Sequence, residues 1–459
     1  MVRKILRNAV FLGVLSGALC AARAEEMQSG CVPLSSDCLL EEARHAAAAL
    51  NRQLQADEAR FAIVAALARL GRLEEASEEK LLIGNPVIEA AAEGEIVRAA
   101  ARMGAFGTAF DMAISIGDVR NRSAKVLALE ALAVEQAAQG AIDAAFDTVI
   151  AINNPFRRTE AQAAIAVSVA QTGDIPAAIR AAARIGMDYW FTTGENRYKI
   201  ASGLVARTGE FDHYWFYEAL AEIAGLQASG GDIPAALQTA HAIPDQAGRA
   251  HAMTRIAAVQ AEQGQIDAAL ESARRIEAAY GDHQAMVAIS EGMAAAGDFD
   301  AAFEMALAVR QAYGDGAALT ALAVRQAAAG LFDASLTTLA GIDVLEDLNR
   351  ARAAIAKEFA RAGRGEDALD LVAQIPDRNE RFQAVEAAVV MLAAAGDAGR
   401  AISLAEDFAG RADLDELIMA IALALARQGD LTGAVDTTGR IEDGMFRAIA
   451  MAGIAGLTG

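Results

Sequence analysis

Aromatic residues make up only 5% of this 459-residue chain, which also has few prolines (7), histidines (5) and cysteines (3). The histidines fall into no HExxH or other two-ligand helical spacing. Also missing are a GxSxG elbow, a phosphate-cradling GxxxxGK[ST] loop, a GxGxxG turn and an acidic EF-hand loop. The sequence therefore predicts no catalytic, cofactor-binding or metal-binding residues.

Long apolar runs are missing too. Residues 1–24 resemble a secretory signal peptide, with a basic start (Arg3, Lys4, Arg7), an apolar stretch from Ala9 to Cys20, and small residues at Ala22 and Ala24. The apolar stretch is shorter than the roughly 20 residues that span a bilayer, and no later run reaches that length. We therefore expect cleavage after Ala24, a periplasmic or secreted protein, and no transmembrane segment. A lipid anchor is disfavoured because Leu19, rather than a small residue, precedes Cys20.

Basic residues are a minority, 40 against 61 acidic ones, which gives a net charge of −21. Removal of the signal peptide makes the chain more acidic still. Such a charge repels phosphate backbones and anionic lipid head groups, so we expect no nucleic-acid partner. The simplest interpretation of the charge is solubility, and basic peptides or cations are the partners that it would favour.

Two cysteines, Cys31 and Cys38, follow the predicted cleavage site within the polar segment 25–40. An exported compartment favours a disulfide between them. In the chain-entropy model so short a loop contributes about 2 to 3 kcal/mol.

Glycine, in contrast, is regularly placed. Twelve glycines divide the chain, and every interval from Gly231 onward is 33 residues: Gly71, Gly104, Gly140, Gly173, Gly209, Gly231, Gly264, Gly297, Gly330, Gly363, Gly396 and Gly429. A fixed period of this size indicates a stack of repeated supersecondary units.

The residues around each glycine predict two helices. The second residue after it is usually apolar, the fifth is small (Ala76, Ala145 and Ala236 among others), and apolar residues follow at the sixth and twelfth places. Before the glycine, the eighth residue back is apolar and the third is usually alanine. These spacings fit helical stripes, and glycine supplies the left-handed residue that ends the first helix. Each unit is therefore predicted to be an αα-hairpin, and no strands are expected.

This pattern resembles the tetratricopeptide repeat, from about Glu41 to the C-terminus. The unit is one residue shorter than the usual length of about 34, small or aliphatic residues replace the large aromatics of the first helix, and the closing proline occurs only at Pro155, Pro244 and Pro376. The resemblance implies an all-α, right-handed superhelical α-solenoid of about 12 αα-hairpins. HEAT-type repeats, whose period is longer, are the structural alternative.

The period fails around Gly209, with intervals of 36 residues before it and 22 after it. We interpret residues 209–230 as an irregular break that has lost about one helix, between N-terminal repeats (41–208) and C-terminal repeats (231–459). Aromatic residues gather there, and the candidate partner-binding residues are Tyr189, Trp190, Phe191, Tyr198, His213, Tyr214, Trp215 and Tyr217. Packing into the gap left by the missing helix is favoured, because a packed core is the commoner fate of large aromatics. A peptide or glycan groove is the alternative.

Two further features recur or stand out. Arginine occupies the eighteenth place after the glycine in five units (Arg122, Arg158, Arg249, Arg381 and Arg447), and ion pairs with nearby aspartates are preferred there over contacts with a ligand. The last segment, Met445 to Leu457, carries a single charge. We expect its apolar face to turn inward, with self-association of the chain as the alternative.

The function that this pattern favours is an exported scaffold that binds a protein or peptide. The alternatives are a cell-wall or glycan binder that uses the aromatic cluster, and an accessory repeat domain of a cell-wall enzyme system. Soluble lytic transglycosylases carry a similar Ala-rich domain, but they add a globular catalytic domain for which the repeats leave no room here. We therefore expect that the chain is not an enzyme and needs no cofactor.

Overall fold

The computed structural model describes residues 35–116, 122–185, 199–201, 204–206, 214–276, 282–408 and 411–458. The predicted signal peptide and Cys31 lie outside these residues. Cys38 is disulfide-bonded. It lies in α2 (Ser36–Ala48), which begins earlier than the repeats were expected to.

Eleven helical hairpins follow one another along the described residues. Their first and second helices are α3 (Gln53–Arg69) and α4 (Leu73–Lys80), α5 (Pro86–Arg102) and α6 (Phe106–Ser115), α7 (Arg122–Ala138) and α8 (Ile142–Ile150), α9 (Pro155–Gln171) and α10 (Ile175–Ala183), α12 (Tyr214–Ser229) and α13 (Ile233–His241), α14 (Gln246–Glu262) and α15 (Ile266–Arg274), α16 (Asp282–Ala295) and α17 (Phe299–Tyr313), α18 (Ala317–Ala328) and α19 (Phe332–Leu339), α20 (Leu345–Arg361) and α21 (Gly365–Ala373), α22 (Arg378–Ala394) and α23 (Ala398–Phe408), and α24 (Arg411–Arg427) and α25 (Leu431–Thr438). A single helix, α26 (Gly444–Ala455), ends the chain. The predicted all-α repeat array is confirmed.

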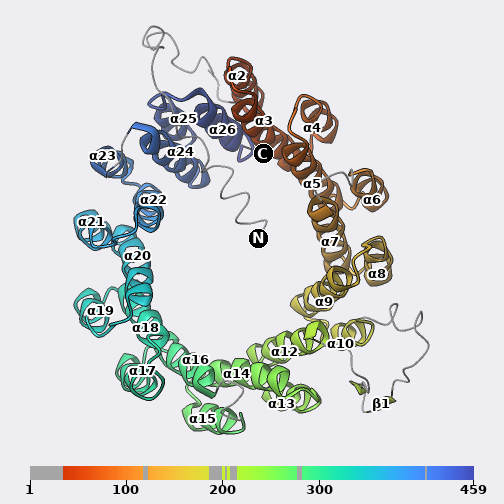
Figure 1. Ribbon diagram of the computed structural model, residues 1–459, viewed down its shortest axis with the longest axis vertical. Coiled ribbons are helices and arrows are strands. Elements are labelled where there is room, and N and C mark those ends of the chain that lie inside the picture. Colours follow the sequence, from red (N-terminus) through yellow and green to blue (C-terminus); the bar gives the residue numbers. More distant parts are fainter. Residues whose placement is uncertain are drawn as a thin grey trace. The chain divides into compact units, whose positions relative to one another are not determined.

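A glycine joins the two helices of every hairpin. Eleven of the twelve predicted repeat glycines have φ between 74° and 91°, a conformation that costs little only without a Cβ. The small residue five places later is buried in all eleven hairpins, as at Ala76, Ala236 and Ser335. Within each of the two compact units described below, first helices form one layer and second helices the other (Figure 1). Small residues therefore let the layers approach closely.

The twelfth glycine, Gly209, lies outside the described residues, but its surroundings do not follow the repeat. Ala206, which occupies the place of a helical alanine, lies in a two-stranded antiparallel ribbon of β1 (Lys199–Ala201) and β2 (Leu204–Ala206). This ribbon is a short exception within the otherwise helical described residues. The hairpins at Gly173 and Gly231 each have both helices, so neither has lost one. Most of the segment 209–230, expected to be irregular, forms α12.

The chain divides into two compact units, Met1–Ala128 with Ala356–Gly459, and Leu129–Ile355. The first unit therefore contains both α2 and α26, the first and last helices of the described residues. No helix in the described part of the chain is both long and apolar enough to cross a membrane.

Within the first unit, α26 packs against α2 and α3 as well as against α24 (Figure 1). Leu39 and Leu40 of α2 and Ile454 of α26 are fully buried. A Cβ on Gly456 would lie 3.2 Å from the Cα of Ala66 in α3, so glycine permits the close approach. Helix α26 thus has the contacts of a first helix and α2 those of a second helix. Together the two ends of the chain form one further helical pair.

This pairing predicts the effect of a truncation after Asp443. Loss of α26 exposes the apolar faces of α2 and α3, and each fully buried Leu or Ile contributes about 1.5 to 3 kcal/mol. We expect a melting temperature lower by several degrees and concentration-dependent self-association, measured by circular dichroism and light scattering. A chain that ends at Gly456 is the control and should behave as the full chain does. Unchanged melting of a monomeric truncated chain would show that the pair contributes little.

Candidate functional site

Three of the eight predicted aromatic site residues lie in the described part of the chain. Tyr214, Trp215 and Tyr217 occupy the first turn of α12. Tyr189, Trp190, Phe191, Tyr198 and His213 lie outside the described residues. The structure therefore brings together one part of the proposed cluster.

The aromatic residues on α12 have different environments. Tyr217 packs against α14, where a Cβ on Gly248 would come within 2.7 Å of its own Cβ. Trp215 makes edge-on contacts with Tyr214 at 5.0 Å and with Phe156 of α9 at 5.8 Å between ring centroids. Tyr214 is 50% exposed and Phe156 is 53% exposed. Tyr217 therefore packs against a neighbouring helix. Tyr214 is exposed, so it does not fill a gap in the stack, which was the interpretation favoured from the sequence.

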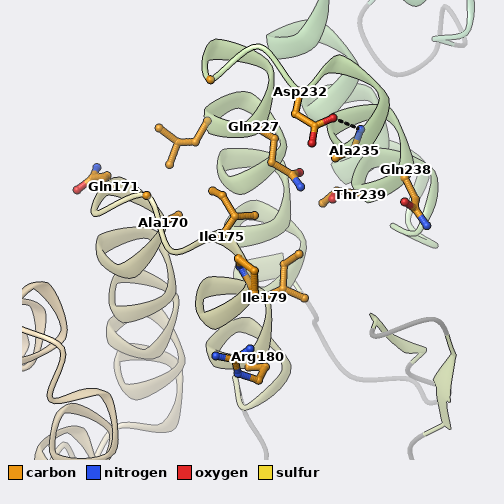
Figure 2. Close-up of a pocket in the computed structure, with 14 residues that line it drawn as sticks. Ala170, Gln171, Ile175, Ile179, Arg180, Gln227, Asp232, Ala235, Gln238 and Thr239 are labelled. Atoms are coloured by element: carbon orange, nitrogen blue, oxygen red, sulfur yellow. Dashed lines mark hydrogen bonds between the residues drawn. The ribbon is translucent and has the colours of Figure 1, made fainter.

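Sequence reasoning missed a cleft of about 830 Å³ in the second unit, between the hairpin α9–α10 and the hairpin α12–α13. Figure 2 shows side chains from both hairpins around it. Its apolar lining includes Ile175, Pro176, Ile179 and Leu226. The polar lining is Gln171, Arg180, Gln227, Asp232, Gln238 and Thr239. The cleft therefore combines apolar surface with amide and charged groups.

The charges in the cleft differ from those of the other hairpins. The seventh residue after each repeat glycine lies on a second helix, and it is acidic in seven of the eleven hairpins: Glu78, Asp111, Asp147, Glu271, Glu304, Asp370 and Asp436. In the two hairpins that form the cleft it is Arg180 and Gln238, both exposed. Arg180 forms no ion pair within the described residues. The replacement of an acidic residue by Arg180 and Gln238 is visible in the sequence, and it could have been used to predict the cleft.

One carboxylate of the cleft is already engaged. Asp232 accepts a hydrogen bond from the backbone N–H of Ala235 at 3.1 Å and so caps α13. In Figure 2, Asp232 and Arg180 lie at opposite ends of the lining. The guanidinium N–H groups of Arg180 therefore remain available as donors to a ligand at the other end of the cleft.

No family model matches the chain, and no curated protein matches it significantly. Among solved structures, the crystal structure of Ton1535 from Thermococcus onnurineus NA1 is 15% identical, with 85% of this chain and 97% of that chain covered and a TM-score of 0.24. At this TM-score the likeness carries no argument about the chain.

Four of the recurrent arginines bind a backbone carbonyl. Arg158, Arg249, Arg381 and Arg447 each donate to the carbonyl oxygen of the isoleucine six residues earlier, at 2.8 to 3.1 Å. These carbonyls follow the second helix, whose C-terminal end leaves acceptors unpaired and carries partial negative charge. Arg249, Arg381 and Arg447 form no ion pair within the described residues. The arginines therefore act as C-terminal caps, while the side chain of Arg122 lies outside the described part.

The cap can be tested with Arg381→Met. We expect a loss of about 1.5 to 3 kcal/mol in unfolding free energy, because a carbonyl loses a charged donor. The loss should be the same at low salt and at 1 M NaCl, whereas an exposed ion pair is screened by salt. Arg378→Met is the control in the same helix, because Arg378 is 80% exposed in its pair with Asp413. A strongly salt-dependent effect at Arg381 would favour the ion pair instead.

Two glutamates outside the cleft have pKa values raised to about 7, and strongly shifted pKa values can mark functional sites. Burial raises the pKa of Glu58 on α3 to about 7, and Asp57 adds to the rise. Burial also raises the pKa of Glu416 on α24 to about 7, with contributions from Glu386 and Asp413. Both helices contact α26, and neither glutamate is a cause of the pKa shift of the other. The shifts therefore describe two separate half-buried carboxyls and not a paired acid and base.

A raised carboxyl pKa implies that the folded state holds its proton more tightly than the unfolded state does. The contribution of Glu416 to the stability of the folded chain is therefore largest below pH 4.5, and it is lost as the pH rises through about 7. We expect Glu416→Gln to raise the unfolding free energy at pH 8 by roughly 1 to 2 kcal/mol, after allowance for solvent screening, and to change nothing near pH 4. Urea titrations at both pH values measure this, with the exposed Glu74→Gln as control. An equal effect at both pH values would contradict it.

Proposed function

We propose that this chain is an exported scaffold that binds a protein or peptide, with the cleft between α9–α10 and α12–α13 as its binding site. The proposal also includes the divergent tetratricopeptide-like character and the signal peptide suggested by the sequence. One observation carries it: the exposed position that is acidic in most hairpins holds Arg180 and Gln238 at the cleft.

The lining supports a polypeptide ligand. Ile175, Ile179 and Leu226 offer apolar contact to a side chain, while the amides of Gln171 and Gln238 offer both donors and acceptors to a peptide backbone. Arg180 adds a planar cation suited to a carboxylate. The net negative charge of the chain repels a carboxylate elsewhere on its surface. A positive charge at Arg180 therefore favours a ligand that carries a carboxylate at this cleft.

The test is to select random hexapeptides on the full mature chain and to measure the affinity of the selected peptides by calorimetry. The double variant Arg180→Glu with Gln238→Glu restores the acidity of the other hairpins at two exposed positions. We expect at least a tenfold loss of affinity, since one lost charged contact is worth about 1.5 to 3 kcal/mol, with an unchanged melting temperature.

Thr337→Glu is the matched control, because Thr337 holds the same exposed place in the hairpin α18–α19. It should leave peptide affinity unchanged. Selected peptides that bind the double variant as tightly as the parent chain would contradict the assignment of the cleft. Retention on peptidoglycan without peptide binding would favour the glycan alternative.

A further inference from the structure

The cleft contains a polar group for which the described residues provide no partner. Gln227 lies in α12, four residues before Gly231, and is 8% exposed. Its side-chain oxygen Oε1 is buried and accepts no hydrogen bond from the part of the chain that the structure describes. In Figure 2 its amide projects into the space between α10 and α13.

The repeats supply an internal comparison for this residue. Glutamine stands four residues before the glycine in four hairpins, and each time Thr or Ser stands twelve residues after the glutamine. In three hairpins the pair is closed: Thr148 donates to Gln136 at 2.7 Å, Ser272 to Gln260 at 2.7 Å, and Thr338 to Gln326 at 2.8 Å. The fourth pair is Gln227 and Thr239, which both line the cleft.

Chemistry alone does not explain the difference, because Gln227 and Thr239 could form the same bond. Thr239 is 3% exposed, as buried as its counterparts. A buried amide oxygen without a donor is unfavourable in a folded protein, and native structures hold few of them. An open pair at the cleft, beside three closed pairs elsewhere, therefore points to a donor that arrives with a ligand.

We propose that Gln227 Oε1 accepts a hydrogen bond from a backbone N–H of a peptide that carries a carboxylate. The peptide places an apolar side chain against Ile175, Ile179 and Leu226, and its carboxylate meets Arg180. This inference rests on the proposed function and names the chemistry that the cleft recognises. The carboxylate can come from the peptide's C-terminus or from an Asp or Glu side chain, and both offer the same chemistry to Arg180.

The first test needs no ligand. Gln227→Met keeps the length of the side chain and removes an acceptor that has no partner, so the melting temperature should stay the same or rise. Gln260→Met is the matched control, because it removes the partner of Ser272, and its melting temperature should fall by several degrees. An equal fall for Gln227→Met would show that the pair with Thr239 is closed, and would overturn the proposal.

The second test uses the hexapeptides selected on the full chain. Each backbone N–H is replaced in turn by an ester oxygen, which removes one donor. One of these replacements should weaken the affinity of the peptide for the parent chain about tenfold. The same replacement should cause no further loss of affinity for the Gln227→Met variant. Versions with an amidated C-terminus distinguish the two sources of the carboxylate, since only a terminal carboxylate is lost by amidation.

The outcomes separate this inference from the proposed function. If the peptides bind, and bind more weakly to the double variant at Arg180 and Gln238, but no ester replacement depends on Gln227, the inference is wrong and the proposed function stands. If no hexapeptide is selected, or if binding ignores the double variant, both are overturned.

Discussion

Close contact between small side chains is the interaction on which this fold depends. Two helices of a hairpin meet at a fully buried small residue, such as Ala145, Ala269 or Ala368, and a left-handed glycine ends the first of the two helices. Alanine offers little apolar area, so the stability of each crossing comes from many short contacts rather than from a few large side chains. Buried isoleucine and leucine at the eighth place before the glycine, such as Ile165 and Ile355, complete each seam. Positions that depart from this pattern are therefore conspicuous.

The two ends of the sequence follow from the same constraint. A stack of hairpins leaves an apolar face at each end unless something covers it. Here α26 takes the place of a first helix and α2 the place of a second helix. Each of them covers apolar surface that the other would leave exposed within the first unit. This explains why the segment Met445 to Leu457 can carry only one charge without being a solvent-facing cap. Cys38, which is disulfide-bonded, lies in the first turn of α2.

The hairpins could be predicted because their signals are local. A glycine, an alanine five places on and helical stripes on both sides lie within about 20 residues, and local geometry decides them. Gly209 misled the prediction because it has an apolar residue two places on and an alanine three places back, as the repeat glycines do. Ala206, however, lies in a strand. The pair of α2 and α26 could not be predicted in this way, since it joins segments some 400 residues apart. The arginine caps were missed because a carbonyl acceptor has no sequence signature, whereas the aspartates nearby do.

The cleft shows why a site in a repeat protein is best sought as a departure from the protein's own pattern. Charge reversal at Arg180 and the open amide of Gln227 involve different atoms and different helices, yet both belong to the two hairpins that form one cleft. A change in helix packing alone would explain why a cleft opens between these two hairpins. It would not explain why Arg180 lines that cleft in a chain of net charge −21. Nor would a simple exchange of surface charge explain a buried acceptor that three sister hairpins satisfy. A ligand with a donor and a carboxylate accounts for both observations at once.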